Sequence, residues 1–237
     1  MIAVVDYGMG NLASVAKAVR FLGHEARVTS DPKQLARAGA VILPGVGAFG
    51  EAMRELRRRK LVKPVLDSVA AGKPFLGLCL GLQLLFESSE ESPGVRGLGL
   101  MPGEVRRFPR RKGLKVPHMG WNSLELSSPP SVGAEGKLQR GSDSRFREND
   151  LLRGIPDGSF VYFVHSYFAA PEEKGLVAAR TRYGGSFPSV LWDGGRVWAT
   201  QFHPEKSQKW GLKILANFLK QEYRVQSTRY SALRSRC

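Results

Sequence analysis

The sequence predicts a mixed α/β fold in which a mostly parallel central sheet is flanked by helices and extended by a region of antiparallel strands. In the first half of the chain, short apolar runs alternate with segments whose apolar residues recur at helical spacing. This order is typical of a parallel sheet with helices on both faces. The second half is richer in strands, and a hairpin turn joins two of them. The 237 residues, 42% of them hydrophobic, suffice for one domain with additions.

Each element of the first half follows from its apolar pattern. The run Ile2–Val5 predicts a buried strand. A helix begins at Leu12, because apolar residues then recur every three or four positions until Gly23 stops it. The next buried strand is Val41–Leu43. The elements after it are a glycine turn at 44–47, helices through 53–56 and 62–69, and a strand at 75–78.

Four apolar runs of the second half predict strands. They are Phe160–Val164, Leu176–Thr181, Pro188–Trp192 and Val197–Phe202. Asp193-Gly194-Gly195 predicts a hairpin between the last two. A final helix over about 207–223 would bury the leucines at 212, 215 and 219.

Two segments lack the pattern of a compact domain. Residues 127–149 are rich in Ser, Gly, Pro and mixed charge, with almost no apolar periodicity, so we expect a mobile inserted loop. Residues 220–237 are basic and have no clear apolar face, so we expect a disordered tail. The predicted organisation is one domain over 1–219, with the insertion inside it, followed by the tail.

The segment 74–83 carries the clearest chemical signal. Its apolar strand runs into a lone cysteine between two glycines, Gly77-Leu78-Cys79-Leu80-Gly81, and an amphipathic run over 80–87 follows. This is the cysteine form of a nucleophile elbow, in which glycines permit a tight strand-to-helix turn. The turn would expose the Cys79 thiol at a helix N-terminus, where the thiolate is favoured.

A second segment can supply a base and its orienting carboxylate. In Phe202-His203-Pro204-Glu205, His203 can take the thiol proton, and an extended backbone would point Glu205 to the same side. A thiol, an imidazole and a carboxylate together indicate acyl-transfer chemistry. Leu80 and the turn residues Val46 and Gly47 are the predicted oxyanion donors. His165 is an alternative base, but no carboxylate lies near it in the sequence.

Charge and cysteine content restrict the other function classes. The net charge of +15 would suit a nucleic-acid-binding protein. The basic runs at 57–60 and 106–112 carry no RNA-binding fingerprint and no interleaved aromatic residues. We therefore interpret them as a solvated face or as a docking surface for an acidic protein, and we keep RNA binding as an alternative.

The chain is expected to be cytoplasmic, with neither a signal peptide nor a membrane span. Cys79 and Cys237 are the only cysteines, which argues against a disulfide framework and for a reducing compartment. No apolar run approaches the roughly 18–20 residues of a membrane span. The four histidines and the internal cysteine are too scattered for a metal site, and we expect no cofactor.

In the Cys79 and His203–Glu205 motifs, the chain resembles the class I, or triad, glutamine amidotransferases. Further segments narrow the resemblance to the glutaminase subunits of imidazole glycerol phosphate synthases. These segments are 6–12, 44–49, 118–122, 162–167 and 203–207. The resemblance covers about 1–126 and 150–219, and the departures from the family pattern are the insertion and the tail.

The resemblance implies a specific activity and partner. Such a subunit hydrolyses glutamine with a Cys79-His203-Glu205 triad and delivers the ammonia to a (β/α)₈-barrel synthase subunit in a heterodimer. The barrel makes imidazole glycerol phosphate and aminoimidazole carboxamide ribotide in histidine biosynthesis. The implied glutamine pocket comprises Gly47, Gln83, His165, Ser166 and Tyr167. The implied partner interface comprises Asn11, His118, Met119, Trp121, Asn122 and Lys206.

Two alternatives stay open. His118 would suit a core position as well as an interface. A glutaminase of another ammonia-using synthase, such as pyridoxal phosphate synthase, would share the triad, although segments 44–49 and 118–122 argue against it.

Overall fold

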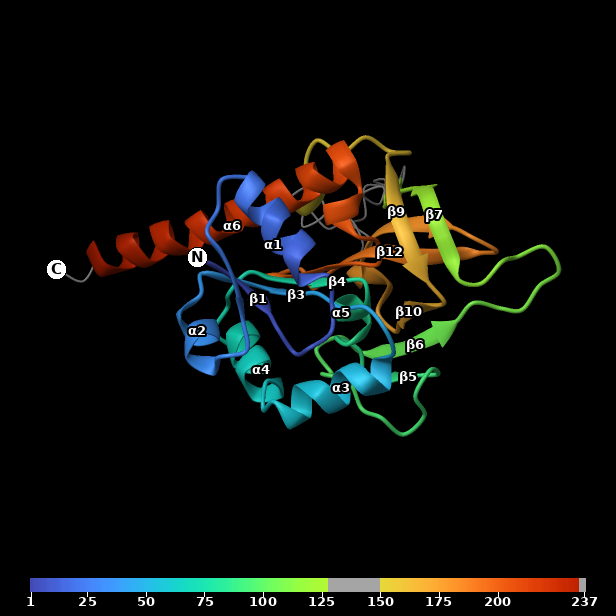
Figure 1. Ribbon diagram of the computed structural model, residues 1–237. Helices are drawn as coiled ribbons and strands as arrows, with labels where there is room; N and C mark the ends of the chain where they lie inside the picture. Colours follow the sequence, from blue (N-terminus) through green and yellow to red (C-terminus); the bar gives the residue numbers. More distant parts are fainter. Residues whose placement is uncertain (128–149, 235–237) are drawn as a thin grey trace, which may run out of the picture.

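The computed structural model describes residues 1–127 and 150–234, and an eight-stranded mixed sheet lies at its centre (Figure 1). The strand order is β2-β1-β3-β4-β13-β12-β11-β8. The strands are β1 Ile2–Val5, β2 Ala26–Thr29, β3 Ala40–Leu43, β4 Phe75–Leu78, β8 Glu125–Leu126, β11 Val177–Arg182, β12 Ser186–Trp192 and β13 Val197–Thr200. Pairing is parallel from β2 to β13 and antiparallel from β13 to β8. The predicted fold class is confirmed.

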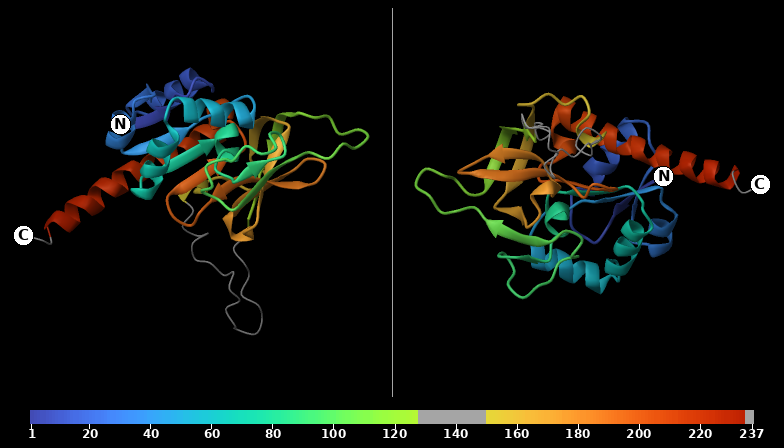
Figure 2. Two further views of the ribbon diagram at one scale, coloured as in Figure 1. Left: turned by 90° about the horizontal axis from the view of Figure 1, so that it is seen from below. Right: turned by 180° about the vertical axis from the view of Figure 1, so that it is seen from behind.

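Helices cover both faces of the parallel part of the sheet (Figures 1 and 2). One face carries α1 (Leu12–Phe21) and α6 (Gln208–Arg234), and the other carries α2 (Pro32–Arg37), α3 (Phe49–Arg58) and α4 (Val62–Ala70). Alternate residues of β1 serve the two cores: Ile2 and Val4 face α1 and α6, whereas Ala3 and Val5 face the other helices. The sheet is therefore buried on both sides.

Two smaller sheets flank the antiparallel end. β10 (Tyr167–Pro171), β6 (Gly103–Arg107) and β5 (Ser88–Ser89) form one of them. β7 (His118–Ser123) pairs antiparallel with β9 (Phe160–His165) in the other. The sequence predicts β9 but not the others, because these strands are short or carry polar residues at alternate positions. The charged, half-exposed β2 and the six-residue α2 escape prediction for the same reason.

Two helices differ from expectation. The run after Cys79 forms only the single turn α5 (Leu80–Gln83), and residues 80–86 are buried on every side, so the predicted amphipathic run to Glu87 is wrong. α6 continues to Arg234, whereas the sequence predicts a helix end near Tyr223 and a disordered tail from 220. In Figure 2 this helix extends well beyond the sheet.

The insertion lies mostly outside the described residues. Its first residue, Ser127, is described and binds β11: the backbone N–H donates to the Ala178 carbonyl (3.0 Å), and the hydroxyl donates to the Val177 carbonyl (2.8 Å). The chain resumes in a short 3₁₀ helix, η2 (Asp150–Leu152). None of the helices in the described parts of the chain combines the length and apolar character needed to cross a bilayer.

Candidate active site

The candidate site lies where three neighbouring parallel strands end. β3, β4 and β13 are adjacent, so their carboxyl ends share one edge of the sheet. The glycine turn 44–47 follows β3, Cys79 follows β4, and His203 comes shortly after β13. The topology thus brings together groups that are far apart in the sequence.

Cys79 occupies the sharp turn between β4 and α5. Its φ of 53° and ψ of −106° are rare for a residue with a side chain and cost about 1–3 kcal/mol. Backbone hydrogen bonds hold the turn: Cys79 N–H donates to the Thr200 carbonyl (2.7 Å), and Leu82 N–H donates to the Cys79 carbonyl (3.0 Å). The thiol is thereby set at the edge of the sheet in a buried position, 5% exposed.

The two glycines of the elbow are required by close packing. A Cβ on Gly77 would lie 2.7 Å from the Gly81 carbonyl oxygen. A Cβ on Gly81 would overlap the carbonyl oxygen of Leu43 at the end of β3. Because both obstacles are backbone atoms, larger residues would displace the nucleophile.

His203 and Glu205 form a buried pair. Nδ1 of His203 lies 2.9 Å from Oε1 of Glu205, with side chains 3% and 1% exposed. The His203 backbone is held by its N–H bond to the Tyr162 carbonyl (3.0 Å) and by the Ser207 hydroxyl on its own carbonyl (2.7 Å). Glu205 reaches the imidazole through a 3₁₀ turn, η4 (Pro204–Lys206), and not through the extended segment that the sequence suggests.

The imidazole of His203 is held in its protonated form. Burial alone would lower its pKa, but the hydrogen-bonded Glu205 carboxylate and the neighbouring Cys79 sulfur raise the pKa to about 10. Nε2 is buried and has no hydrogen-bond partner among the residues that the structure describes. An imidazolium between the thiol and a carboxylate is suited to give a proton to a leaving group and to take one back afterwards.

His165 is unsuited to the same role. Its Nδ1 binds the Tyr167 carbonyl (2.8 Å) and its Nε2 binds Nδ1 of His118 (3.0 Å). Burial lowers its pKa to about 3, and the positive charge of His203 contributes. Both ring nitrogens are occupied, so the alternative base has no free nitrogen for the thiol.

A cavity of about 380 Å³ opens beside Cys79. Nine predicted site residues line it: Val46, Gly47, Cys79, Leu80, Gln83, His165, Ser166, Tyr167 and His203. Glu205 lies behind His203. Glu91, Pro117 and Val164 also line the cavity, and the sequence does not predict them.

Glu91 places a carboxylate in this cavity. Its Oε2 accepts a hydrogen bond from the N–H of Phe49 at the start of α3 (2.7 Å). Its backbone N–H donates to the hydroxyl of Ser89 (3.2 Å). The residue sits in a loop with no motif, so the sequence carries no signal for it.

Three backbone N–H groups near the thiol lack acceptors. Those of Val46, Gly47 and Leu80 donate to no group within the described ranges 1–127 and 150–234. Gly47 has a φ of +97°, and a Cβ there would lie 2.7 Å from the Met9 side chain. These free donors are available to a developing oxyanion.

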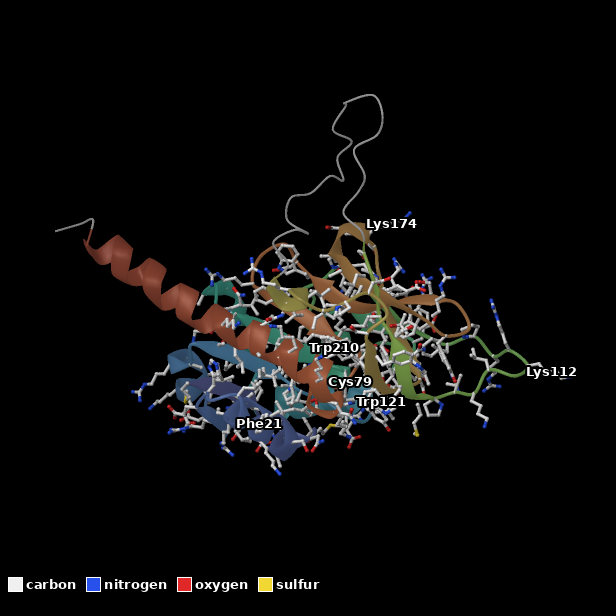
Figure 3. The ribbon with its side chains drawn as sticks, turned by 90° about the horizontal axis from the view of Figure 1, so that it is seen from above. Phe21, Cys79, Lys112, Trp121, Lys174 and Trp210 are labelled. Atoms are coloured by element: carbon white, nitrogen blue, oxygen red, sulfur yellow. The ribbon has the colours of Figure 1, made fainter. Side chains whose placement is uncertain are left out.

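One face of the β7–β9 ribbon is apolar and exposed next to the cavity. Met119 is 63% exposed, Trp121 46% and Phe160 57%, and Trp121 meets Tyr162 edge to face. Figure 3 shows Trp121 and Cys79 together with Lys112 on the loop that projects between β6 and β7. Of the other predicted interface residues, Asn11 and Asn122 are half-buried and Lys206 is exposed.

His118 does not belong to that exposed face. It points inward from β7, is 3% exposed, and stacks on Tyr183 with ring centroids 3.9 Å apart. Burial lowers its pKa to about 4. His118 is therefore buried in the position that the alternative expects, and it does not contribute to the exposed face of the ribbon.

Comparison with known proteins places the chain among amidotransferases. The family model described as glutamine amidotransferase class-I matches residues 3–221. The chain is 47% identical to the imidazole glycerol phosphate synthase subunit HisH of Desulfitobacterium hafniense, covering 92% of this chain and 93% of that protein. It is 49% identical to HisH of Rhodopirellula baltica, covering 92% and 96%.

Solved structures share the fold at lower identity. The crystal structure of a glutamine amidotransferase superposes with a TM-score of 0.67 at 20% identity, covering 94% of this chain and 99% of that one. The structure of PurLQS from Thermotoga maritima superposes with a TM-score of 0.66 at 18% identity, covering 93% and 97%.

Proposed function

Because this chain belongs to the class I glutamine amidotransferases, and within them to the HisH subunits of imidazole glycerol phosphate synthase, we propose that Cys79, His203 and Glu205 are its catalytic triad. The observation that carries the proposal is the arrangement in the cavity. A strained cysteine and a buried imidazole–carboxylate pair share one cavity of a size suited to an amino acid.

The mechanism follows from these positions. The Cys79 thiolate attacks the side-chain carboxamide carbon of glutamine and forms a carbon–sulfur bond. The His203 imidazolium gives its proton to the departing nitrogen, so that ammonia leaves and a thioester remains. Water then adds to the thioester with His203 as base, releasing glutamate and regenerating the thiolate. Glu205 keeps the imidazole oriented and balances its charge.

The free N–H groups of Leu80 and of the 44–47 turn would stabilise the tetrahedral oxyanion. Each such donor contributes about 2.7–4 kcal/mol in comparable acyl-transfer sites. Leu80 is fixed by the elbow. Val46 and Gly47 belong to a turn whose glycine at 47 allows the peptide plane to rotate.

Polar groups around the cavity can recognise the amino-acid end of glutamine. The Glu91 carboxylate is an acidic partner for the α-ammonium group, and the loop Ser166–Tyr167 borders the same space. Gln83 reinforces that loop by donating from Nε2 to the Tyr167 carbonyl (2.9 Å). Specificity for an amino acid with a free ammonium group would follow from this arrangement.

The exposed apolar face Met119, Trp121 and Phe160 is the proposed docking surface for the synthase subunit. A half-exposed tryptophan beside the cavity mouth is a suitable anchor for an interface. The proposed partner is a (β/α)₈ barrel that accepts the ammonia and makes imidazole glycerol phosphate and aminoimidazole carboxamide ribotide, in the cytoplasm. The resemblance to HisH supports this partner over the synthase of pyridoxal phosphate.

Covalent labelling tests the nucleophile. A glutamine analogue with an electrophilic carbon should modify Cys79 and leave Cys237 much less modified, because Cys79 lines the cavity together with His203. Peptide mapping by mass spectrometry locates the adduct. A Cys237→Ser variant should label as fast as the parent protein, and preferential labelling of Cys237 would overturn the assignment.

A further inference from the structure

Gln201 contacts the nucleophile from a fully buried position. Its side chain is 0% exposed, and its Nε2 lies 3.8 Å from Sγ of Cys79, within range for an amide N–H donating to sulfur. Its backbone N–H donates to the Ser189 carbonyl (2.9 Å), which fixes the residue at the end of β13. No step of the mechanism above uses this contact.

Gln83 fixes the orientation of the Gln201 amide. Nε2 of Gln83 donates to Oε1 of Gln201 (3.2 Å), so Nε2 of Gln201 must face the sulfur. The second N–H of the same Gln83 amide donates to the Tyr167 carbonyl (2.9 Å). Both amides are therefore held by more than one contact, in a buried setting where an unpaired polar group is costly.

Two neutral histidines extend this series of hydrogen bonds beyond the Tyr167 carbonyl. That oxygen only accepts, so His165 donates to it from Nδ1 (2.8 Å) and offers a bare Nε2. Nδ1 of His118 must then donate to that Nε2 (3.0 Å). Each contact dictates the tautomer of the next ring, and burial keeps both rings neutral.

Asn122 is the last residue in this series of hydrogen bonds, and it lies on β7 of the ribbon. Its Oδ1 accepts from the Ser123 N–H (2.8 Å), which identifies its nitrogen as the donor to Nε2 of His118 (3.2 Å) and to the Arg182 carbonyl (3.0 Å). Asn122 lies on β7 next to Trp121 of the docking surface. One continuous set of hydrogen bonds thus joins the partner-facing strand to the nucleophile.

We propose that Gln201 is a positioning residue for the Cys79 thiolate, and that the Gln83, His165, His118 and Asn122 side chains hold Gln201 in its donating orientation. This inference rests on the proposed role of Cys79 as the nucleophile. The Gln201 amide directs its N–H toward the negatively charged sulfur. This hydrogen bond stabilises the thiolate and limits the movement of the Cys79 side chain. A substitution of His118, which does not line the cavity, should therefore alter the reactivity of the Cys79 thiol.

Thiol reactivity tests this without relying on glutaminase activity. In a Cys237→Ser background, only Cys79 can displace iodide from iodoacetamide, so the pH profile of alkylation reports its thiolate. Gln201→Leu should shift the profile upward by about one pH unit and slow alkylation about tenfold on the acidic limb of the profile, as expected for loss of a hydrogen bond to an anion. The titratable groups around Cys79, namely Tyr7, Glu91, His165, His203 and Glu205, remain in place.

Variants of His118, which is farther from Cys79 in the series of hydrogen bonds, supply a sharper comparison. His118→Phe keeps a ring in the aromatic cluster but removes the donor to His165, so it should shift the profile in the same direction as Gln201→Leu. His118→Asn places an amide N–H near the position of Nδ1 and should restore most of the parent reactivity. Tyr183→Phe is the matched control, because it preserves the ring stacked on His118 and removes only a hydroxyl bonded to the Lys115 carbonyl.

Three outcomes decide the proposal. It is supported if Gln201→Leu and His118→Phe shift the profile together while Tyr183→Phe does not. It is overturned if the Gln201→Leu profile coincides with that of the parent, or if His118→Phe and His118→Asn behave alike. Thermal melts identify variants that fail to fold, in which case Gln201→Met, which is unbranched, replaces the leucine variant. Glutaminase assays on the same proteins should show a fall in kcat with little change in KM. Loss of the proposed function would appear separately, as activity retained by Cys79→Ala.

Discussion

In the proposed mechanism, the chemistry of Cys79 depends on His203 being charged before glutamine arrives. The imidazolium lies between the sulfur and the Glu205 carboxylate, and those two neighbours outweigh the burial that would otherwise lower its pKa. The acid that protonates the leaving nitrogen is thus already present at neutral pH. In this proposal Glu205 acts through the His203 imidazole, to which it is hydrogen-bonded.

Substitutions of His203 and of Glu205 should therefore reduce kcat by different factors. His203→Ala removes the proton carrier, whereas Glu205→Gln leaves the imidazole in place with a weaker orienting group. We expect Glu205→Gln to reduce kcat about 10- to 100-fold less than His203→Ala does. Steady-state glutamate release measures both, and an unchanged rate for Glu205→Gln would remove Glu205 from the mechanism.

Residues with a local motif can be predicted from the sequence, and residues defined by distant contacts cannot. Cys79 and His203 stand in short segments whose spacing itself indicates chemistry. Glu91 and Gln201 acquire their roles only when separate loops and strands meet. The sequence leaves the position of His118 open because β7 inverts the usual pattern: its polar residues face inward to a hydrogen-bond chain, while Met119 and Trp121 face outward.

At the scale of elements, the site depends on the close contact between β3, β4 and α5. At the elbow, the backbone of α5 packs directly against the backbone of β3. The glycine turn after β3 packs against the same helix: a Cβ on Gly45 would lie 2.6 Å from the Tyr7 hydroxyl and 2.8 Å from Cβ of Leu80. Positions predicted as turn residues are therefore also packing positions. Short strands such as β5 and β8 could not be predicted, because two residues carry no periodicity.

A substitution at Gly81 should show how tight this contact is. Gly81→Ala would place a methyl group into the Leu43 carbonyl, so we expect a loss of about 3 kcal/mol or more in the free energy of unfolding. Gly175→Ala is the control: it has no neighbour within 4 Å and should change stability by about 0.5 kcal/mol or less. Denaturant unfolding measures both, and equal stabilities would refute the packing argument.

At the scale of the whole molecule, two buried neutral histidines link stability to pH. The pKa of His118 is lowered to about 4 and that of His165 to about 3, whereas an unfolded histidine titrates near 6.5. Between these values His118 and His165 each bind more protons in the unfolded chain than in the folded one, so their contribution to stability rises with pH. This contribution is fully present above pH 6.5 and is lost as the pH falls towards 4 and 3. His203, whose pKa is raised to about 10, contributes with the opposite sign, mainly above pH 6.5.

We therefore expect the free energy of unfolding to fall between pH 6.5 and pH 5, below the range in which His203 contributes most. His118→Phe should make the fall smaller, because only His165 then contributes. Urea titrations at the two pH values measure the difference. An equal pH dependence in the parent and His118→Phe would show that His118 is not the source.

Val164, the strand partner of Met119 in the β7–β9 ribbon, lines the same cavity as Val46 and Gly47 of the 44–47 turn, so the proposed docking surface adjoins the proposed active site. A glutaminase without an acceptor for its ammonia gains from being switched on by its partner. Rotation of the peptide at Gly47 would bring a second oxyanion donor into place, worth about 10²–10³ in rate.

Glutamate release by this chain, mixed with the proposed (β/α)₈-barrel synthase subunit and a nucleotide ligand of that subunit, tests the central claim most directly. We predict low activity for the chain alone, strong stimulation by the liganded partner, no activity for Cys79→Ala, and parent-like activity for Cys237→Ser. Full activity of the isolated chain, unchanged by the partner, would contradict the gating. Activity retained by Cys79→Ala would contradict the account of the nucleophile itself.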